Sequence, residues 1–445
     1  MTAHLQSGDM RRSLHEGGMT RLPFELHPDA SRVVIRPFLP AEDSLALTGP
    51  ERSRLQDIAD RILALDSAEA SAYLAQTLRP FQERDFPAEH LFEARFEEVN
   101  GRIIGKCAAT RDQALLIGAY LHQEYSYEAA ALFNPSIVPH PDQSNLPEGS
   151  LRFVLSLRGV GEGHISSITF RTGAYNIETG LELDTPSRHV VTHRLERDTA
   201  AGACDGRVRI VCNEGHDLSE RVIFPVTARQ RNGIEDLRLV RFIEDDGSAH
   251  YLGTYTAYDG RVIAPELLAT DDFRVFDLHR LDGPGAVNKG LALFPRRIDG
   301  KYALLCRHDD ENIWFALSND LHHWGASVTA VAPRYPWEFV KIGNCGSPIE
   351  LNEGWLVITH GVGAVRNYAI GACLLDKNDP SKLLARTPEP LLRATAHERE
   401  GYVPNVVYSC GSLVHDGMLL LPYAIADSYT TFATMPVERL LAIME

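Results

Sequence analysis

From residue 133 nearly to its end, this sequence is a succession of short apolar runs separated by turns. The runs include LRFVLSLR, LRLVRFI, YLGTYTAY, GWLVITHGV and MLLLPYAIA. The turns include EDDGS, YDGR and RIDGK, in which Asp-Gly supplies a positive φ. Because no helix-length segment intervenes, the spacing predicts an all-β meander. A closed β-propeller protects the edges of so many short strands, and a β-sandwich or jelly roll fits the pattern almost as well.

The first 130 residues have a different character. Residues 1–30 are polar and contain glycines, and we expect a mobile arm or a strap across a neighbouring subunit. Residues 40–98 show a helical period, carried by Leu55, Ile58, Ile62 and Leu65. Residues 112–132 are predicted to form another helix. The expected organisation is an arm and helical extension over 1–130 and a β domain over 131–445.

Charge and cysteine usage limit the kinds of partner. The chain has 60 acidic and 44 basic side chains, a formal net charge of −16, which disfavours nucleic acid and anionic membranes as partners. Its seven cysteines show no CxxC spacing, which is typical of reduced thiols. Neither a signal-peptide core nor an apolar run of transmembrane length is present. We therefore expect a cytoplasmic protein.

Four polar segments interrupt or end the apolar runs. They are Asn134-Pro135-Ser136, the segment GIEDLR with Asp236, the segment KIGNCG with the later His360, and Asp427 at the end of LLLPYAIAD. Loops at strand ends are where propellers and barrels build their sites. Taken singly, each segment has an ordinary structural explanation, since an Asp at a strand end usually caps a turn. No His/Cys/Asp spacing of a metal site, serine nucleophile elbow or P-loop is present.

The order of the motifs is more specific than any one of them. FNPS, LSLRGVGEGHISSI, GIEDLR, NKGLALFPRRIDGKYALLCR, NIWFALSNDLHHWG, VKIGNCGSPIELNEGWLVITHGV, YAIGACLLDKNDPSKLLART and LLLPYAIAD follow one another along the chain. In content and order they resemble glycoside hydrolase family 130, the β-mannoside phosphorylases and β-mannosidases. The resemblance covers about residues 130–445. It implies a five-bladed β-propeller with the active site in its central funnel.

The resemblance also implies roles for individual residues on the sugar side. Asp236 matches the family's proton donor, with Leu237 in place of the usual proline. The proton is expected to pass by way of a sugar hydroxyl, so Asp236 need not touch the glycosidic oxygen. The mannose ring before the cleaved bond is expected to be held by Asn134, Arg158 and Asp427.

On the other side, the resemblance implies a basic cluster that receives inorganic phosphate. It consists of Lys289, Arg307, Lys341 and His360, with the hydroxyl of Tyr368 near the same pocket. Lys289 stands where several relatives have arginine, which replaces a bidentate contact by a point charge. Arg307 is followed by His-Asp-Asp instead of the frequent His-Arg-Pro, and this places two carboxylates near the expected anion site.

Inverting cleavage needs a proton for the leaving oxygen and a nucleophile on the opposite sugar face. A single marked carboxylate suffices when phosphate is the nucleophile, because phosphate is already anionic. Together with this single carboxylate, the resemblance implies phosphorolysis of a β-mannoside to α-mannose 1-phosphate, and we expect neither a metal nor an organic cofactor. A hydrolase would need a second carboxylate as base, from the set Glu162, Glu235, Asp309 and Asp310. A third interpretation is a sugar-binding propeller without catalytic activity. The helical extension is the expected contact of a homo-oligomer.

Overall fold

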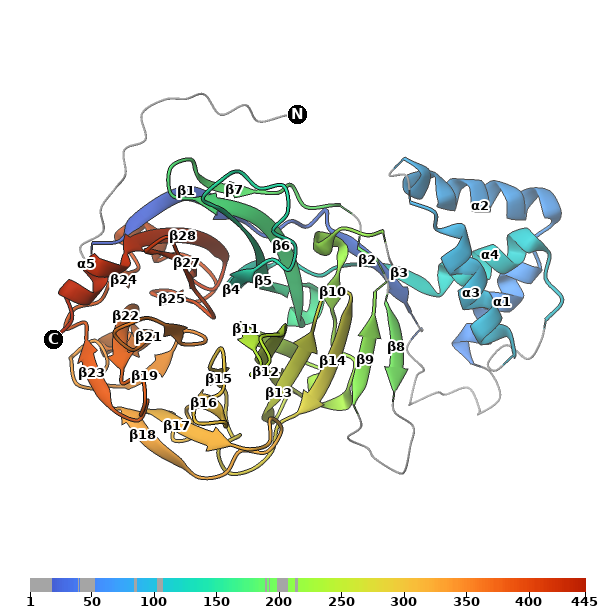
Figure 1. Cartoon of the computed structure of the whole chain (residues 1–445). Helices are drawn as coiled ribbons and strands as arrows, with labels where there is room; N and C mark the ends of the chain where they lie inside the picture. Colours follow the sequence, from blue (N-terminus) through green and yellow to red (C-terminus); the bar gives the residue numbers. More distant parts are fainter. Residues whose placement is uncertain are drawn as a thin grey trace. The chain divides into compact units, whose positions relative to one another are not determined.

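The chain forms two units, and the smaller one interrupts the sequence of the larger (Figure 1). The structure is a computed structural model that describes residues 18–38, 40, 53–83, 86–101, 107–188, 190–191, 193–197, 207–212 and 215–445. The smaller unit is Val33–Ser126, and the larger combines Met1–Arg32 with Tyr127–Glu445.

The smaller unit is a helical unit closed by one strand pair. Its elements are β2 (Val33–Pro37), α1 (Arg54–Leu63), α2 (Ser67–Gln82), α3 (Glu89–Val99), α4 (Arg111–Tyr120) and β3 (His122–Ser126). Capping boxes start α2 and α4, through Asp66 with Glu69 and Thr110 with Gln113. Gly118 lets α4 approach α3 closely, because a Cβ there would lie 1.9 Å from the Phe92 carbonyl oxygen. No helix in the described part of the chain is long and apolar enough to span a bilayer.

The helix expected over residues 112–132 is wrong beyond Tyr120. The chain then forms β3, which pairs with β2, and β4 begins at Ala131. Burial explains the change of structure. Glu124 is exposed, Tyr125 is buried, Ser126 is half-buried and Tyr127 is buried, and this alternation has the period of a strand.

The larger unit is almost entirely β-structure. Its strands are β1 (Thr20–Leu26), β4 (Ala131–Pro139), β5 (Ser150–Val160), β6 (Ser166–Asn176), β7 (Gly180–Leu183), β8 (Arg194–Arg197), β9 (Val208–Val211), β10 (Val222–Ile223), β11 (Gly233–Ile243), β12 (Ala249–Tyr258), β13 (Ile263–Thr270), β14 (Val275–Arg280), β15 (Ala292–Leu293), β16 (Tyr302–Cys306), β17 (Ile313–Ser318), β18 (Ser327–Val331), β19 (Lys341–Asn344), β20 (Ile349–Glu350), β21 (Trp355–Val362), β22 (Tyr368–Leu375), β23 (Leu383–Arg386), β24 (Leu392–Arg393), β25 (Val407–Tyr408), β26 (Leu413–His415), β27 (Met418–Ile425) and β28 (Tyr429–Pro436). A short helix, α5 (Val437–Ala442), follows the last strand.

These strands form antiparallel groups in chain order. Group 1 is β4–β7 with β10, group 2 is β11–β14 with β9 and β8, group 3 is β15–β18, group 4 is β19–β24, and group 5 is β25–β28 with β1. Groups 1 and 2 belong to one eleven-stranded sheet, but only the parallel pair Gly233–Ser166 links β11 to β6. In Figure 1 the groups surround a common centre, with β4, β11, β15, β19 and β25 nearest to it.

Buried apolar clusters lie between each group and the next. One cluster joins groups 1 and 2, another groups 2 and 3, and the series continues through groups 4 and 5 back to group 1. Each cluster contains residues from both of the groups that it joins. The pairs are Phe170 and Tyr251 for groups 1 and 2, Phe242 and Leu304 for groups 2 and 3, Phe315 and Trp355 for groups 3 and 4, Ile370 and Leu421 for groups 4 and 5, and Phe432 and Leu155 for groups 5 and 1. The main core is therefore a ring of contacts between sheet faces, which leaves the strand ends near the centre for polar residues.

The expected N-terminal arm is in part a strand of the larger unit. β1 pairs antiparallel with β28, with Thr20 opposite Thr434. Leu22, Phe24 and Leu26 alternate along β1 and pack on the cluster between groups 5 and 1. This segment therefore belongs with the β-structure and not with the helical extension, while residues 1–17 lie outside the described residues.

A buried ion cluster lies where the chain leaves and re-enters the larger unit. Glu128 is fully buried and accepts from Arg32 Nη1 at 3.2 Å and from Arg171 Nη2 at 2.8 Å. Arg32 also donates to the Ser219 carbonyl oxygen. Breaking such a buried pair typically costs about 3–5 kcal/mol, because one charge is left unpaired.

Candidate active site

Each of the five groups contributes polar side chains to one cavity of about 210 Å³. Asn134, Asp236, Lys341 and Tyr408 come from β4, β11, β19 and β25, and Lys289 comes from the segment before β15. All nine residues expected in the site line this cavity. The complete lining is Asn134, Arg158, Asp236, Lys289, Arg307, Lys341, His360, Arg366, Tyr368, Val403, Val406, Tyr408 and Asp427.

Two β-bulges place Asn134 and Asp236. The strand register shifts between Phe133 and Ser136 on β4, and between Glu235 and Arg238 on β11. At these shifts Asn134 has φ 50° and Asp236 has φ 56°, a region that Asn and Asp tolerate better than most residues. Ser136 Oγ accepts from the Leu239 amide at 3.0 Å and so ties the two bulges together.

Leu237 follows Asp236 at the position where the family usually has proline. It is 3% exposed and belongs to the cluster between groups 1 and 2. The leucine that stands in place of proline thus packs in the core, and Asp236 still lies at a β-bulge.

Asp236 is held by two donors from group 1. Its Oδ1 accepts from Asn134 Nδ2 at 2.6 Å and from Arg158 Nη1 at 3.2 Å. Arg158 donates also to Glu235 at 2.7 Å and to Ser166 Oγ at 2.8 Å, so its guanidinium is fixed on three sides. These contacts orient one carboxylate oxygen of Asp236 toward group 1.

The two carboxyl groups of the cavity have opposite pKa shifts. Burial alone would raise the pKa of Asp236, but the positive charges of Arg158 and Lys289 lower it to about 2. Burial raises the pKa of Asp427 to about 6, and repulsion from Asp236 adds to this. The ligand-free cavity thus holds an ionised Asp236 beside a carboxyl that keeps its proton into the weakly acidic range.

Arg238 and Tyr408 connect Asp236 to the side of the cavity that contains His360 and Arg307. Arg238 is 2% exposed and donates to Tyr408 Oη at 2.7 Å and to the Asp236 carbonyl oxygen at 3.4 Å. The Tyr408 ring lies 4.8 Å from the ring of His360, which in turn stacks on Tyr368 at 5.9 Å. These buried contacts fix the spacing between the two sides of the cavity.

His360 is neutral and positions Arg307. Its Nε2 lies 3.0 Å from Arg307 Nη1, and because a guanidinium cannot accept, Nε2 is the acceptor. The ring proton is therefore on Nδ1, which faces Cys345 Sγ at 3.8 Å. Burial and then the charge of Arg307 lower the pKa of His360 well below its ordinary value. The cluster expected to be basic thus contains three cations and one neutral imidazole.

The cations Arg307 and Lys341 face one carboxylate of the chain. Lys341 Nζ lies 3.1 and 3.0 Å from the two oxygens of Asp310, and Arg307 Nε lies 3.4 Å from Oδ1. Lys289, in contrast, makes no hydrogen bond or ion pair to any described residue, and Asn288 beside it donates to the Arg307 carbonyl oxygen at 3.1 Å.

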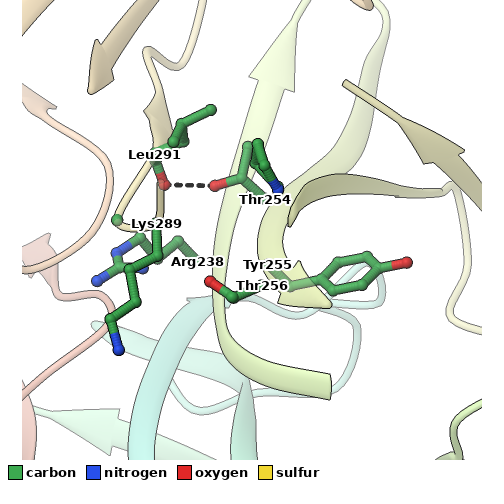
Figure 2. Close-up of a pocket in the computed structure, with 8 residues that line it drawn as sticks. Arg238, Thr254, Tyr255, Thr256, Lys289 and Leu291 are labelled. Carbon is green, nitrogen blue, oxygen red and sulfur yellow. Dashed lines mark hydrogen bonds between the residues drawn. The ribbon is translucent and has the colours of Figure 1, made fainter. Parts of the chain in front are cut away.

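Lys289 also borders a second, smaller pocket, together with Arg238 and Thr254 (Figure 2). Figure 2 shows the Thr254 hydroxyl donating to the Leu291 carbonyl oxygen, which ties the segment after Lys289 to β12. The main chain around Lys289 is therefore anchored on both sides, while its amino group stays available to a ligand.

The four carboxylates considered as a hydrolytic base are engaged or exposed. Glu235 pairs with Arg158, and Asp309 accepts from the amides of Glu311 and Asn312 in its own turn. Asp310 pairs with Lys341, and Glu162 is exposed on its loop. None of the four is among the described residues that line the cavity.

The model of glycoside hydrolase family 130, described as beta-1,4-mannooligosaccharide phosphorylase, matches residues 117–445. The chain belongs to glycoside hydrolase family 130. Its resemblance to this family, expected from eight ordered motifs, is confirmed, and so is the predominance of β-structure in the larger unit.

Several proteins similar to this chain are mannoside phosphorylases. The 1,2-beta-oligomannan phosphorylase of Thermoanaerobacter sp. (strain X514) is 35% identical over 235 residues, 50% of this chain and 74% of that protein. The beta-1,4-mannooligosaccharide phosphorylase of Ruminococcus albus is 36% identical over 163 residues, 34% of this chain and 49% of that protein. The solved structure of beta-1,2-mannobiose phosphorylase from Listeria innocua, complexed with beta-1,2-mannobiose, has a TM-score of 0.50 and 25% identity, covering 71% of this chain and 92% of that one.

Two polar residues of this family 130 cavity were missed from the sequence. Tyr408, the last residue of β25, was not singled out. Arg366 ends the segment HGVGAVR at 360–366, which matches RGVGEGH at 158–164; the match pairs Arg366 with His164, which is not among the residues that line the cavity, so this repeat does not mark Arg366. Both repeats form the same loop, closed by hydrogen bonds from Gly161 to Ile165 and from Gly363 to Asn367.

Proposed function

We propose that this chain catalyses the inverting phosphorolysis of a β-mannoside and releases α-mannose 1-phosphate. The observation that carries the proposal is the placement, in one cavity, of a carboxyl group held by Asn134 and Arg158 and of three cations around a neutral histidine. Relatives named as phosphorylases of β-1,2- and β-1,4-mannosides support this reaction class.

In the proposed reaction Asp236 supplies the proton to the leaving oxygen, by way of a sugar hydroxyl. Asn134, Arg158 and Asp427 hold the mannose ring, and their hydrogen-bonding groups suit sugar hydroxyls. Phosphate then attacks from the opposite face, which inverts the anomeric centre.

The phosphate is bound by Lys289, Arg307 and Lys341, with Tyr368 at the edge of the same pocket. His360 contributes no charge; as an acceptor it holds Arg307 in a fixed orientation, and preorganised donors of this kind lower the cost of binding an anion. No metal ion and no organic cofactor takes part in the proposed chemistry.

Phosphate binding also favours the protonated form of Asp236, which the proton transfer requires. The cations that lower the pKa of Asp236 to about 2 include Lys289, which we assign to phosphate. Because a bound phosphate neutralises this charge, the pKa of Asp236 rises when the cavity is loaded. The proton donor is then formed in the complex and not in the free enzyme.

We infer further that the larger unit is a five-bladed β-propeller, with groups 1 to 5 as its blades. Support comes from the apolar clusters, which connect each group to the next and group 5 back to group 1. Such closure leaves the cavity at the centre, where the inner strands of all groups contribute.

The test is a release assay on β-1,2- and β-1,4-mannobiose with and without inorganic phosphate. We expect cleavage only with phosphate, and α-mannose 1-phosphate as the first product seen by ³¹P and ¹H NMR. Equal release of free mannose without phosphate would overturn the proposal in favour of hydrolysis. Binding of mannobiose without turnover under either condition would favour a sugar-binding protein.

A further inference from the structure

The carboxylate of Asp310 lies on two of the three cations assigned to phosphate. Both of its oxygens are within 3.1 Å of Lys341 Nζ, and Oδ1 is 3.4 Å from Arg307 Nε. Lys341 and Arg307 are largely buried at the cavity wall, whereas the side chain of Asp310 is 53% exposed. A negatively charged group of the chain thus already contacts the positions where an anion would bind.

The main chain around Asp310 is fixed, but its side chain can swing outward. Asp309 Oδ1 accepts from the amides of Glu311 and Asn312 at 3.0 Å each, and the Glu311 carbonyl oxygen accepts from the Ile342 amide at 2.9 Å. More than half of the Asp310 side chain is exposed among the described residues. Rotation of one side chain is therefore enough to uncover Lys341 and Arg307.

We propose that Asp310 is a resident carboxylate of the anion subsite, which inorganic phosphate must displace, and that it weakens and thereby sets the affinity of the enzyme for phosphate. The inference rests on the proposed function. Asp310 and a phosphate oxygen cannot accept from the same Lys341 donors at once, and a phosphate bound beside an undisplaced Asp310 meets a like charge. The affinity observed for phosphate is thus its intrinsic affinity reduced by the share of molecules with Asp310 in place.

The test compares Asp310→Asn, Asp310→Glu and wild type by calorimetric titration of inorganic phosphate into the free enzyme. Asn is suited to the backbone of Asp310, which has φ 59°, so the fold is expected to be retained. The control is Asp379→Asn, which removes the same charge from a 3.0 Å pair with Lys382 outside the cavity lining.

We expect Asp310→Asn to tighten phosphate binding about 3- to 10-fold, as an ion pair with one exposed partner allows. Asp310→Glu, which keeps the charge, should bind phosphate within about 2-fold of wild type, and so should the control. The KM for phosphate should fall in parallel in Asp310→Asn.

An Asp310→Asn variant that binds phosphate no better than Asp379→Asn overturns the inference. A loss of kcat with unchanged phosphate binding also overturns it, and would make Asp310 a base in the reaction. The calorimetric result is independent of the release assay. If the protein cleaves no mannoside but Asp310→Asn binds phosphate more tightly than wild type, only the proposed function is contradicted.

Discussion

Asp236 and Asp427 show how one cavity can hold two carboxyl groups in different protonation states. Asp236 faces the Arg158 guanidinium at 3.2 Å, whereas none of the described residues donates a hydrogen bond to Asp427, which is repelled by Asp236. Since the charge of Asp427 is unfavourable in the folded protein, this residue should oppose folding, and in the proposed function it would do so while holding the sugar. Sites that carry function at a cost in stability are common.

Asp427→Asn should therefore stabilise the protein at neutral and alkaline pH. The pKa of Asp427 rises from 3.8 to about 6 on folding, so the folded chain binds this proton more tightly than the unfolded chain. Below pH ~4 both states are protonated and the variant gains nothing. Above pH ~6 the wild type must bury a charge, and the variant should gain up to about 3 kcal/mol.

Thermal unfolding at pH 4 and pH 8 checks this expectation. The variant should melt a few degrees above wild type at pH 8, with the difference vanishing at pH 4. A gain of equal size at both pH values would show that repacking, and not ionisation, is responsible.

Asp236→Asn should abolish most turnover and keep phosphate binding. Asn fits φ 56° and can still accept from Asn134 and Arg158, but it has no proton to transfer. General acid catalysis contributes about 10²- to 10⁴-fold, and we expect a loss of kcat in that range. Initial rates of mannobiose phosphorolysis measure it, with melting temperature as the control for folding. Retention of most activity would mean that another group donates the proton.

The sequence singled out nine residues that line one cavity, because they are polar side chains within ordered family motifs. Their contacts could not be predicted. Nothing in the sequence places the carboxylate of Asp310 on Lys341, 31 residues away, or makes His360 an acceptor for Arg307. Such pairings depend on which strand ends meet at the centre, and that is a property of the tertiary packing.

At the scale of elements, the pair β19–β21 shows how closely the main chain fits the site. Gly343 on β19 lies opposite His360 on β21, and a Cβ at Gly343 would lie 2.4 Å from His360 Cε1 and 3.0 Å from Arg307 Nη1. Only a residue without a side chain leaves room for this imidazole and guanidinium together. β19 thus leaves space for His360 and Arg307 because Gly343 has no side chain.

Gly343→Ala should displace His360 and Arg307 and weaken phosphate binding. Overpacking of a buried site costs about 1–3 kcal/mol, so we expect at least about a 5-fold loss of phosphate affinity in calorimetry. Gly325→Ala is the matched control, because a Cβ there meets nothing within 4 Å. If Gly343→Ala binds phosphate as the control does, the cations are not held as rigidly as the contacts indicate.

Sequence patterns identified most strands of the β region, but they placed the boundaries between helical and β segments poorly. The strands are recognisable as short apolar runs between turns, and some of them, such as β21, bury both faces. β1 was missed because Leu22, Phe24 and Leu26 bury their side chains only against the cluster between groups 5 and 1, formed by residues far away in sequence. The helix assigned to 112–132 ran too far because a helical period continues by chance across Tyr120 into β3.

At the scale of the whole molecule, the helical unit is an insertion with neighbouring ends. Val33 and Ser126 are register partners in the pair β2–β3, so the two connections lie about one strand spacing apart. None of the described residues of this unit lines the cavity. The larger unit should therefore keep its structure when the insertion is removed.

We expect a protein in which residues 33–126 are replaced by Gly-Asn-Gly to fold and to retain phosphorolysis within about 3-fold. The design keeps Arg32, Glu128 and β1, which a simple truncation of residues 1–125 would partly remove. That truncation is the comparison: it leaves Glu128 without Arg32 and β28 without its partner, and should lower the melting temperature markedly. Light scattering on both proteins tests the expected role of the insertion in a homo-oligomer. A folded but inactive insertion-free protein would show that the helical unit takes part in catalysis.

The pairing of β1 with β28 has a consequence for biosynthesis. Thr20 lies opposite Thr434, so these partners are separated by more than four hundred residues of translation. At about 5–20 residues per second, β1 leaves the ribosome roughly 20–80 seconds before β28 exists. During this interval the nascent chain carries the apolar face of Leu22, Phe24 and Leu26 without its native cover. Group 5 is thus completed last, because β1 has to wait for β28 to be synthesised.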